Sequence, residues 1–322
     1  RAGNLGDYII MKKIAIVFPG QGSQSIGMGK SLYERFASAR AVFDAANDVL
    51  GYDLKGMAFS GPASDLDRTE NTQPALLAAG VAAFRVLIEE TGVHPTSFAG
   101  HSLGEFTALC AAGVLDFKDA VRLVHLRGRF MQESVPQGVG KMSAIIGLGL
   151  NDVIEACGSA STTESVVVAA NVNGPQQVVI SGHADAVLRA EGIAKQKGAK
   201  MIVPLVVSAP SHSPLMKNAA ERLAAELKGI GLRQFNVPVY SNVEATLVAD
   251  PTLVPRLLVR QLTSPVQWVD IIKRMKADGV TTVLEAGPGK VLTGLVKRIE
   301  PSLETVNFSE AADLDKVKAA LR

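Results

Sequence analysis

Short apolar runs alternate with longer segments of helical periodicity along much of the chain. The short runs have the length of buried strands, and the longer segments repeat their apolar residues as amphipathic or buried helices do. Predicted strands lie at 14–18, 96–100, 237–242 and 281–287, and predicted helices at 73–92, 117–134 and 311–321. Strands that alternate with covering helices predict an α/β fold with a mainly parallel sheet.

The pattern changes near Pro136. From 142 to 207 the sequence predicts the order strand, helix, strand, strand, helix, strand, with a hairpin turn at Asn173-Gly174. This is the ferredoxin-like order, so we expect a ferredoxin-like subdomain inserted into a larger α/β-hydrolase-like domain, with the active cleft between them. The expected extents are 136–208 for the insert and 11–135 plus 209–322 for the larger domain, with residues 1–10 as a leader or added segment outside the fold.

Composition narrows the function classes. Hydrophobic residues make up 47% of the chain and charged residues 20%, which supports a substantial core. A net charge of +2 gives no reason to expect a nucleic-acid partner. We expect no membrane partner, because no apolar run reaches membrane-spanning length and no signal-peptide pattern is present. Cys110 and Cys157 both lie in predicted helices, and neither needs a disulfide bond. This suits a cytoplasmic location.

The stretch Gly100-His101-Ser102-Leu103-Gly104 has the pattern G-x-S-x-G. In this pattern small residues let a strand turn sharply into a helix and expose the serine hydroxyl at the bend. A predicted strand precedes the stretch and an alanine-rich helical segment follows it, so the local context fits. We interpret Ser102 as a nucleophile, and the alternative is a polar residue in an ordinary turn.

A serine nucleophile needs a base, for which histidine is the usual residue near neutral pH. His212 lies in the loop where the chain leaves the insert, between two prolines, and is the preferred candidate among five histidines. His101 adjoins the serine, but adjacent side chains point apart at a sharp turn. The acidic residues between 102 and 212, including Glu105 in the elbow helix, are mostly expected in solvated or capping roles. We therefore expect a Ser/His dyad whose imidazole is held by a carbonyl.

The glycine-rich loop at 18–31 fits neither common phosphate-binding pattern. A dinucleotide loop requires glycine where Ser25 stands, and a P-loop requires glycine at Gln24. A sharp turn after a strand still presents backbone N–H groups, and acyl-transfer sites use one such group together with the N–H that follows the nucleophile. These groups belong to Gln21 and Leu103. The alternative is a plain turn between a strand and a helix.

Arg127 falls in the apolar stripe of the predicted helix at 117–134, together with Ala120, Val124 and Met131. A buried guanidinium needs a partner, because an unpaired buried charge is costly. A structural ion pair is the commoner outcome. Beside an acylating serine, a substrate carboxylate is the better candidate, since guanidinium binds carboxylate with two parallel hydrogen bonds.

Together these residues resemble the malonyl-CoA:acyl carrier protein transacylases of fatty acid synthesis and the acyltransferase domains of polyketide synthases. The resemblance covers nearly the whole chain from Met11, and the pairing of FPGQGSQ with GHSLGE is highly specific. The motifs are FPGQGSQ at 18–24, NTQPALLA at 71–78, GHSLGEF at 100–106, RGRFMQ at 127–132, NVNGPQQVVISG at 171–182, PSHSPLM at 210–216, QLTSPVQW at 261–268 and EAGPGKVL at 285–292.

The resemblance implies a role for each matching residue. Ser102 would carry the acyl group, His212 would be its base, and Arg127 would bind the malonyl carboxylate. The backbone N–H groups of Gln21 and Leu103 would form the oxyanion hole. The main-chain carbonyl of Gln261, the first residue of QLTSPVQW, would orient the imidazole in place of an acid.

The implied activity is ping-pong transfer of malonyl from malonyl-CoA to the phosphopantetheine thiol of holo acyl carrier protein, with no metal or other cofactor. Three alternatives remain at the sequence level: a serine hydrolase or thioesterase, a non-catalytic module that docks carrier proteins, and a trans-acting polyketide acyltransferase. The sequence does not fix the oligomeric state, for which a monomer is the working expectation.

Overall fold

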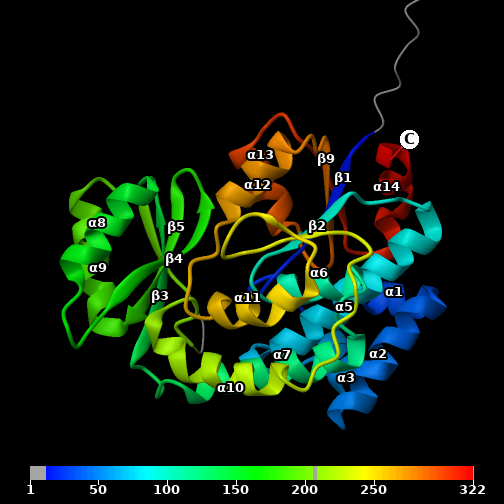
Figure 1. The fold of residues 1–322 in the computed structure, drawn as a ribbon, viewed down its shortest axis with the longest axis horizontal. Coiled ribbons are helices and arrows are strands. Elements are labelled where there is room, and N and C mark those ends of the chain that lie inside the picture. The colour runs from blue at the N-terminus through cyan, green and yellow to red at the C-terminus, as the bar shows by residue number, and fades with distance from the viewer. Residues whose placement is uncertain (1–11, 206–208, 322) are drawn as a thin grey trace, which may run out of the picture.

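The computed structural model describes residues 12–205 and 209–321, which form two bodies side by side (Figure 1). The expected leader at 1–10 and the end of the strand predicted up to residue 207 lie outside the described residues. The larger body contains a mainly parallel sheet and most of the helices, and the smaller body contains an antiparallel sheet with two helices.

The sheet of the larger body has six strands in the order β10-β9-β1-β2-β7-β8. All neighbouring pairs are parallel except β7 with β8, which confirms the predicted mainly parallel α/β architecture. β8 and β10 were not expected from the sequence, since β8 has only two residues and β10 mixes polar with apolar residues. The strands are β1 Ile14–Phe18, β2 Ser97–Gly100, β7 Val239–Tyr240, β8 Leu247–Val248, β9 Thr282–Ala286 and β10 Glu304–Phe308.

Helices cover both faces of this sheet. Successive side chains of β1 point to opposite faces, so Ile16 and Phe18 enter one core while Ala15 and Val17 enter the other. The helices are α1 Lys30–Arg35, α2 Ala37–Leu50, α3 Leu54–Ser60, α4 Ala63–Leu66, α5 Thr69–Thr91, α6 Leu103–Ala111, α7 Phe117–Glu133, α10 Lys217–Leu227, α11 Val254–Gln261, α12 Trp268–Ala277, α13 Val291–Ile299 and α14 Leu314–Leu321. Short 3-10 turns lie at Pro214–Met216, Pro251–Leu253 and Ala311–Asp313.

Helix α5 reaches the length and hydropathy of a membrane span, which differs from the expectation of no such run. Of its most apolar 18-residue window, 78% is buried inside the protein. The helix packs against α2, α6 and α7. Its apolar residues therefore belong to the core of the larger body.

The smaller body has the predicted strand and helix order, with sheet order β4-β5-β3-β6 and all pairs antiparallel. Its two helices share a separate core with one face of the sheet, which confirms the ferredoxin-like subdomain. We propose the extent 136–208 for it, of which 206–208 lie outside the described residues. The elements are β3 Gly140–Ile146, α8 Leu150–Ala160, β4 Val167–Gly174, β5 Gln177–His183, α9 Ala184–Gln196 and β6 Met201–Pro204.

A backbone bridge joins the smaller body to the larger one. The Val172 N–H donates to the Val266 carbonyl, and the Val266 N–H donates to the Ala170 carbonyl, both at 2.9 Å. Val266 lies five residues after Gln261, between α11 and α12. The bridge therefore ties β4 to the segment that begins with Gln261.

The glycines around Ser102 permit close packing of the elbow. A Cβ at Gly104 would lie 2.1 Å from the carbonyl oxygen of Phe18, and one at Gly100 would lie 1.9 Å from the Gly104 carbonyl oxygen. Both obstacles are backbone atoms, which cannot turn aside as a flexible side chain can. The start of α6 consequently rests directly on the end of β1.

We expect Gly104→Ala to lower the free energy of unfolding by at least ~1–3 kcal/mol, because the added methyl group meets backbone. Gly192→Ala is the matched control. It lies inside α9 with no atom near its hypothetical Cβ, so alanine should stabilise the protein by roughly 0.5–1 kcal/mol. Denaturant unfolding measures both changes. Equal stabilities of the two variants would contradict the packing argument.

Candidate active site

Ser102 lies at the sharp turn between β2 and α6, with φ 51° and ψ −105°. A positive φ is unfavourable for a residue with a Cβ and costs roughly 1–3 kcal/mol. The Asn242 side chain holds the turn, since its Oδ1 accepts from the Ser102 N–H at 2.7 Å and its Nδ2 donates to the Gly100 carbonyl at 2.6 Å. The serine side chain is thereby presented at the end of the sheet.

The structure brings His212 to Ser102, although 110 residues separate them. The imidazole Nε2 lies 2.8 Å from the Ser102 Oγ, and Nδ1 lies 2.7 Å from the backbone carbonyl of Gln261. Because a carbonyl only accepts, Nδ1 must carry the proton, which leaves the Nε2 lone pair directed at the serine. No carboxylate among the described residues makes a hydrogen bond to this ring.

His212 is 2% exposed and has φ 59°. Burial and, to a smaller extent, the nearby Arg127 cation lower the pKa of its imidazole to about 3. The imidazole is therefore neutral at physiological pH, which is the form that can accept a proton.

Arg127 is 1% exposed on α7. Its side chain therefore lies on the buried face of the helix, as the spacing of apolar residues predicted. Its guanidinium donates from Nη1 to the Gln73 Oε1 at 2.8 Å, and from Nη2 to the Gln261 Oε1 at 2.9 Å and the Ser102 Oγ at 3.2 Å. Gly128 allows this approach, because a Cβ there would lie 2.6 Å from the Thr69 carbonyl oxygen of α5.

All three acceptors of Arg127 are neutral, and its Nε–H has no partner within the part of the chain that the structure describes. Burial lowers the pKa of Arg127 to about 10, so the group is still a cation at neutral pH. Among the described residues no carboxylate forms a direct ion pair with this guanidinium, although the buried Glu105 lies near enough to raise its pKa. The guanidinium retains the capacity to bind an anion beside Ser102.

Gln21 and Leu103 are the residues whose backbone N–H groups were expected to form the oxyanion hole. Leu103 is the first residue of α6, where backbone N–H groups have no partner within the helix. Gln21 follows β1, and its side-chain Nε2 donates to the Thr69 Oγ1 at 3.1 Å. Both residues line the same cavity as Ser102.

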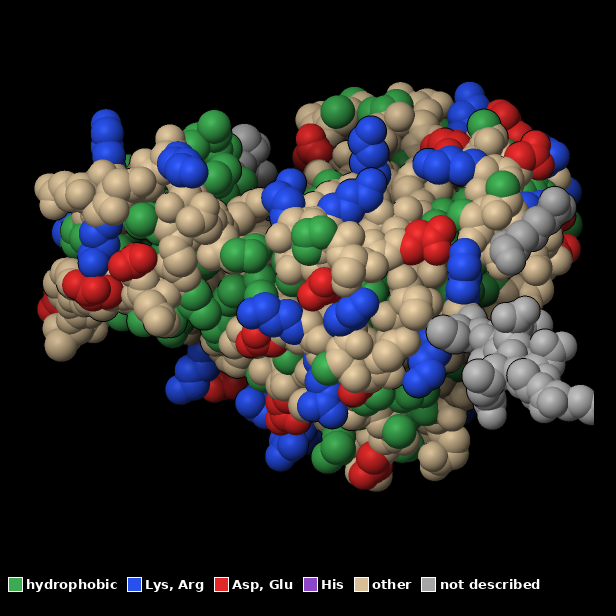
Figure 2. All heavy atoms as spheres, turned by 90° about the horizontal axis from the view of Figure 1, so that it is seen from above, with side chains coloured by type: hydrophobic (Ala, Val, Ile, Leu, Met, Phe, Trp, Pro, Cys, Tyr) green, Lys and Arg blue, Asp and Glu red, His purple; other side chains and the backbone are tan. Residues whose placement is uncertain are grey.

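This cavity has a volume of about 590 Å³ and lies between the two bodies. Figure 2 shows the two bodies from above, with a hollow between them. The size is within the range of ligand pockets. The larger body contributes Gln21, Ser102, Leu103, Arg127 and His212, among others, and the smaller body contributes Met142, Asn171, Asn173, Val179 and Leu205.

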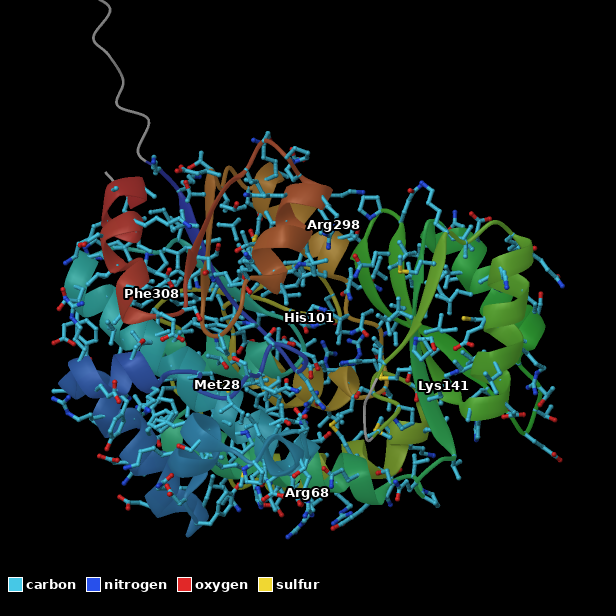
Figure 3. The ribbon with its side chains drawn as sticks, turned by 180° about the vertical axis from the view of Figure 1, so that it is seen from behind. Met28, Arg68, His101, Lys141, Arg298 and Phe308 are labelled. Atoms are coloured by element: carbon cyan, nitrogen blue, oxygen red, sulfur yellow. The ribbon has the colours of Figure 1, made fainter. Side chains whose placement is uncertain are left out.

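His101 lies between the two bodies (Figure 3). Its Nε2 is 2.8 Å from the Asn173 Oδ1 of the smaller body, and its ring packs against Trp268. Burial lowers the pKa of His101. The residue therefore connects the elbow to the wall of the cleft.

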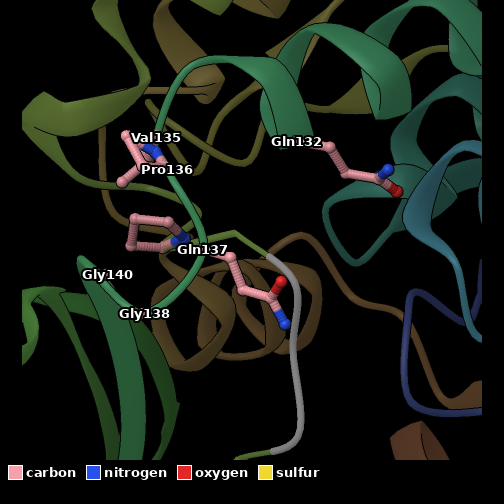
Figure 4. Close-up of a pocket in the computed structure, with 7 residues that line it drawn as sticks. Gln132, Val135, Pro136, Gln137, Gly138 and Gly140 are labelled. Atoms are coloured by element: carbon pink, nitrogen blue, oxygen red, sulfur yellow. The ribbon is translucent and has the colours of Figure 1, made fainter.

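A second cavity of about 280 Å³ lies beside the connection from α7 to β3 (Figure 4). It is lined by Gln132, Val135, Pro136, Gln137, Gly138, Gly140 and Pro210, none of which titrates. Among the described residues no group of three or more His, Cys, Asp or Glu side chains could hold a metal ion. Of these two cavities, the cleft that contains Ser102 is thus the one with reactive side chains.

Glu105 corrects one expectation, because it is neither solvated nor capping. It is 4% exposed on α6, and its carboxylate accepts from the Gln261 Nε2 at 2.5 Å and the Asn242 N–H at 3.3 Å. Burial raises the pKa of Glu105 to about 7. A charged residue in the otherwise apolar helix LGEFTALCA is the sequence signal that could have revealed it. Asn242 and Gln73 were also missed as site residues; Gln73 lies in the NTQPALLA motif at 71–78, whereas nothing local distinguishes Asn242.

Comparison with known proteins identifies acyltransferase relatives that match most of the chain. The acyl transferase domain family matches residues 15–314. A malonyl CoA-acyl carrier protein transacylase of Haemophilus influenzae is 48% identical over 312 residues, covering 97% of this chain and 100% of the relative. The corresponding protein of Bacillus subtilis is 45% identical, covering 95% and 96%.

Solved structures agree. An acyl carrier protein S-malonyltransferase from Vibrio cholerae has a TM-score of 0.92 at 49% identity, covering 95% of this chain and 99% of that one. A malonyl-transacylase in complex with a type II PKS acyl-carrier protein has a TM-score of 0.93 at 46% identity, covering 96% and 99%. The matched region includes both sheets, the elbow and the cleft, and the chain therefore belongs to the acyl transferase family.

Proposed function

We propose that the chain transfers the malonyl group of malonyl-CoA to the phosphopantetheine thiol of an acyl carrier protein in fatty acid synthesis. The observation that carries this conclusion is a buried guanidinium with neutral partners, placed 3.2 Å from the hydroxyl of a serine that also contacts a neutral histidine. The relatives at 45–48% identity are named for the same transfer. The enzyme is an acyltransferase, and neither a hydrolase, a docking module nor a polyketide acyltransferase is favoured.

In the first half-reaction, His212 takes the proton of Ser102 as the serine oxygen attacks the thioester carbonyl. The backbone N–H groups of Gln21 and Leu103 donate to the oxyanion of the tetrahedral intermediate. The carbon–sulfur bond then breaks, and the departing coenzyme A thiolate accepts the proton from the imidazolium of His212. A malonyl ester remains on Ser102.

The second half-reaction reverses these steps with a different thiol. The phosphopantetheine thiol gives its proton to His212 and attacks the ester carbonyl. The serine oxygen leaves and recovers the proton, so the enzyme returns to its starting state. The Gln261 carbonyl, 2.7 Å from Nδ1, keeps the imidazole oriented and stabilises its protonated form.

Arg127 binds the free carboxylate of the malonyl group in this proposal. Bringing that carboxylate into a buried site removes it from water, and an opposite charge offsets the cost. Acetyl groups lack the carboxylate and leave the guanidinium without an anionic partner. The cleft therefore favours a carboxylated acyl group over a plain one.

We also propose the setting in which the enzyme works. The mechanism needs no metal ion or other cofactor, because protein groups handle every proton and charge. A cytoplasmic location is supported by the free thiols of Cys110 and Cys157, and a monomer stays the working expectation. On the face drawn in Figure 2, basic and acidic side chains are interspersed, which favours neither a nucleic acid nor a membrane as partner.

Ser102→Ala and His212→Ala test the covalent mechanism. Intact mass spectrometry after mixing with malonyl-CoA should show a malonyl adduct on the unchanged protein and none on Ser102→Ala. Turnover of either variant should fall by a factor on the order of 10⁶ if the pair acts as a unit. A persistent adduct on Ser102→Ala would move the nucleophile elsewhere, and near-normal rates for His212→Ala would remove its role as base.

Arg127→Ala tests acyl selectivity. Loss of the cation should cost ~2–5 kcal/mol in malonyl transfer while acetyl transfer is spared. The malonyl to acetyl ratio of kcat/KM should therefore fall at least about 30-fold. Arg127→Lys should recover only part of the loss, because an ammonium group cannot form two parallel hydrogen bonds.

Arg122→Ala is the matched control for this substitution, since Arg122 is an exposed arginine on the same helix, paired with Glu226. It should leave the ratio unchanged. If Arg127→Ala lowered the melting temperature and reduced both activities equally, Arg127 would be a structural residue and not a selectivity residue.

The low pKa of His212 predicts a titration that proton NMR can follow. An ordinary histidine protonates with a pKa of about 6.5, whereas His212, at about 3, should stay neutral from about pH 8 to about pH 5. Its ring signals, assigned by their loss in His212→Gln, should hardly shift over that range. The unfolded chain protonates first, so this residue reduces stability as pH falls below about 6.5. A midpoint near 6.5 in the folded protein would be inconsistent with the burial argument.

A further inference from the structure

One buried carboxylate beneath the cleft has no part in the mechanism above. Glu105 points from α6 into the protein, where Leu109, Val239 and Leu258 line the small space next to it. Its two oxygens have different partners: Oε2 accepts from the Gln261 side chain and Oε1 from the Asn242 backbone N–H. Burying a carboxylate costs free energy, so we expect Glu105 to have a specific role.

Gln261 is the residue through which Glu105 reaches the cleft. Its Nε2 donates to both the Glu105 Oε2 at 2.5 Å and the Ser102 carbonyl at 3.0 Å. Its Oε1 is thereby left to accept from the Arg127 Nη2 at 2.9 Å, and its backbone carbonyl accepts from His212 at 2.7 Å. One glutamine thus contacts the residues proposed to bind the carboxylate and to move the proton.

The direction of the Gln261 amide depends on Glu105. An amide can be turned by half a rotation with little change in shape, so hydrogen-bond partners decide its orientation. The reversed orientation would set its NH₂ group against the guanidinium of Arg127, where both groups are donors. It would also set its oxygen against the carboxylate of Glu105, where both are acceptors.

We propose that Glu105 is a positioning residue that fixes the Gln261 amide and thereby places Arg127 for a carboxylated acyl group. This inference rests on the proposed function and concerns the selectivity of the same site. Glu105 does not touch the guanidinium, which therefore stays available to the substrate. The carboxylate of the GHSLGE motif thus acts from behind the cleft, through the Gln261 side chain.

Glu105→Gln is the direct test, because glutamine has the same shape but only one acceptor oxygen. One of the two donors, the Gln261 Nε2 or the Asn242 N–H, must then face an NH₂ group. We expect the malonyl to acetyl ratio of kcat/KM to fall about tenfold, the effect of one mispaired hydrogen bond to a charged group. Glu105→Asp keeps two acceptor oxygens and should retain more of the ratio than Glu105→Gln.

A double-mutant cycle tests whether Glu105 affects selectivity through the Gln261 side chain. Gln261→Ala keeps the backbone carbonyl but removes the amide, and should lower the ratio by a similar factor. In that background, Glu105→Gln should change the ratio by less than about threefold, because the contact through which it acts is already absent. If Glu105→Gln alone does not fold, Gln261→Ala tests the same contact, and an unchanged ratio there overturns the proposal.

Glu285→Gln is the matched control for loss of a buried carboxylate. Glu285 on β9 accepts from the backbone N–H groups of Leu292 and Thr293 at 3.0 and 2.7 Å, at the start of α13. It should lower the melting temperature and leave the ratio unchanged. A wild-type ratio in Glu105→Gln, or additive losses in the cycle, would overturn the positioning role while malonyl transfer by the wild type stands. Absence of any malonyl adduct on the wild type would instead refute the proposed function, and this inference with it.

Discussion

A guanidinium buried among neutral oxygens is the constraint around which the cleft is built. Arg127 has been taken out of water without an ion pair, so its hydrogen bonds to Gln73, Gln261 and Ser102 must hold it. The same cation disfavours a second positive charge on His212 and helps to keep the imidazole neutral. Charge recognition and proton transfer thus depend on one desolvated group.

Backbone strain at two residues accompanies this arrangement. Ser102 and His212 both have a positive φ, which side chains with a Cβ rarely adopt. Asn242 fixes the first through hydrogen bonds to both sides of the turn, and the Gln261 carbonyl fixes the second through the imidazole. Strained residues held in this way lose little further freedom when substrate arrives, so their geometry is present beforehand.

Local patterns predicted much of this molecule, and long-range packing accounts for what they missed. The elbow at Ser102, the buried position of Arg127 and the choice of His212 as base follow from short motifs, helical spacing and loop context, and the role of Gln261 came from a family resemblance. β10 was missed because its residues mix polar and apolar types. Glu105 was missed because glutamate on a helix usually faces solvent, and its burial depends on Asn242 and Gln261, which are at least 137 residues away. No local pattern contains that information.

The backbone bridge between β4 and Val266 has a mechanical consequence. Two hydrogen bonds of 2.9 Å attach the smaller body to the segment that carries Gln261. A hinge rotation that widened the cleft at this end would have to break both, and would pull on the carbonyl that aligns His212. The two bodies therefore behave here as a single stiff frame, in which the width of the cleft and the alignment of the base are set together.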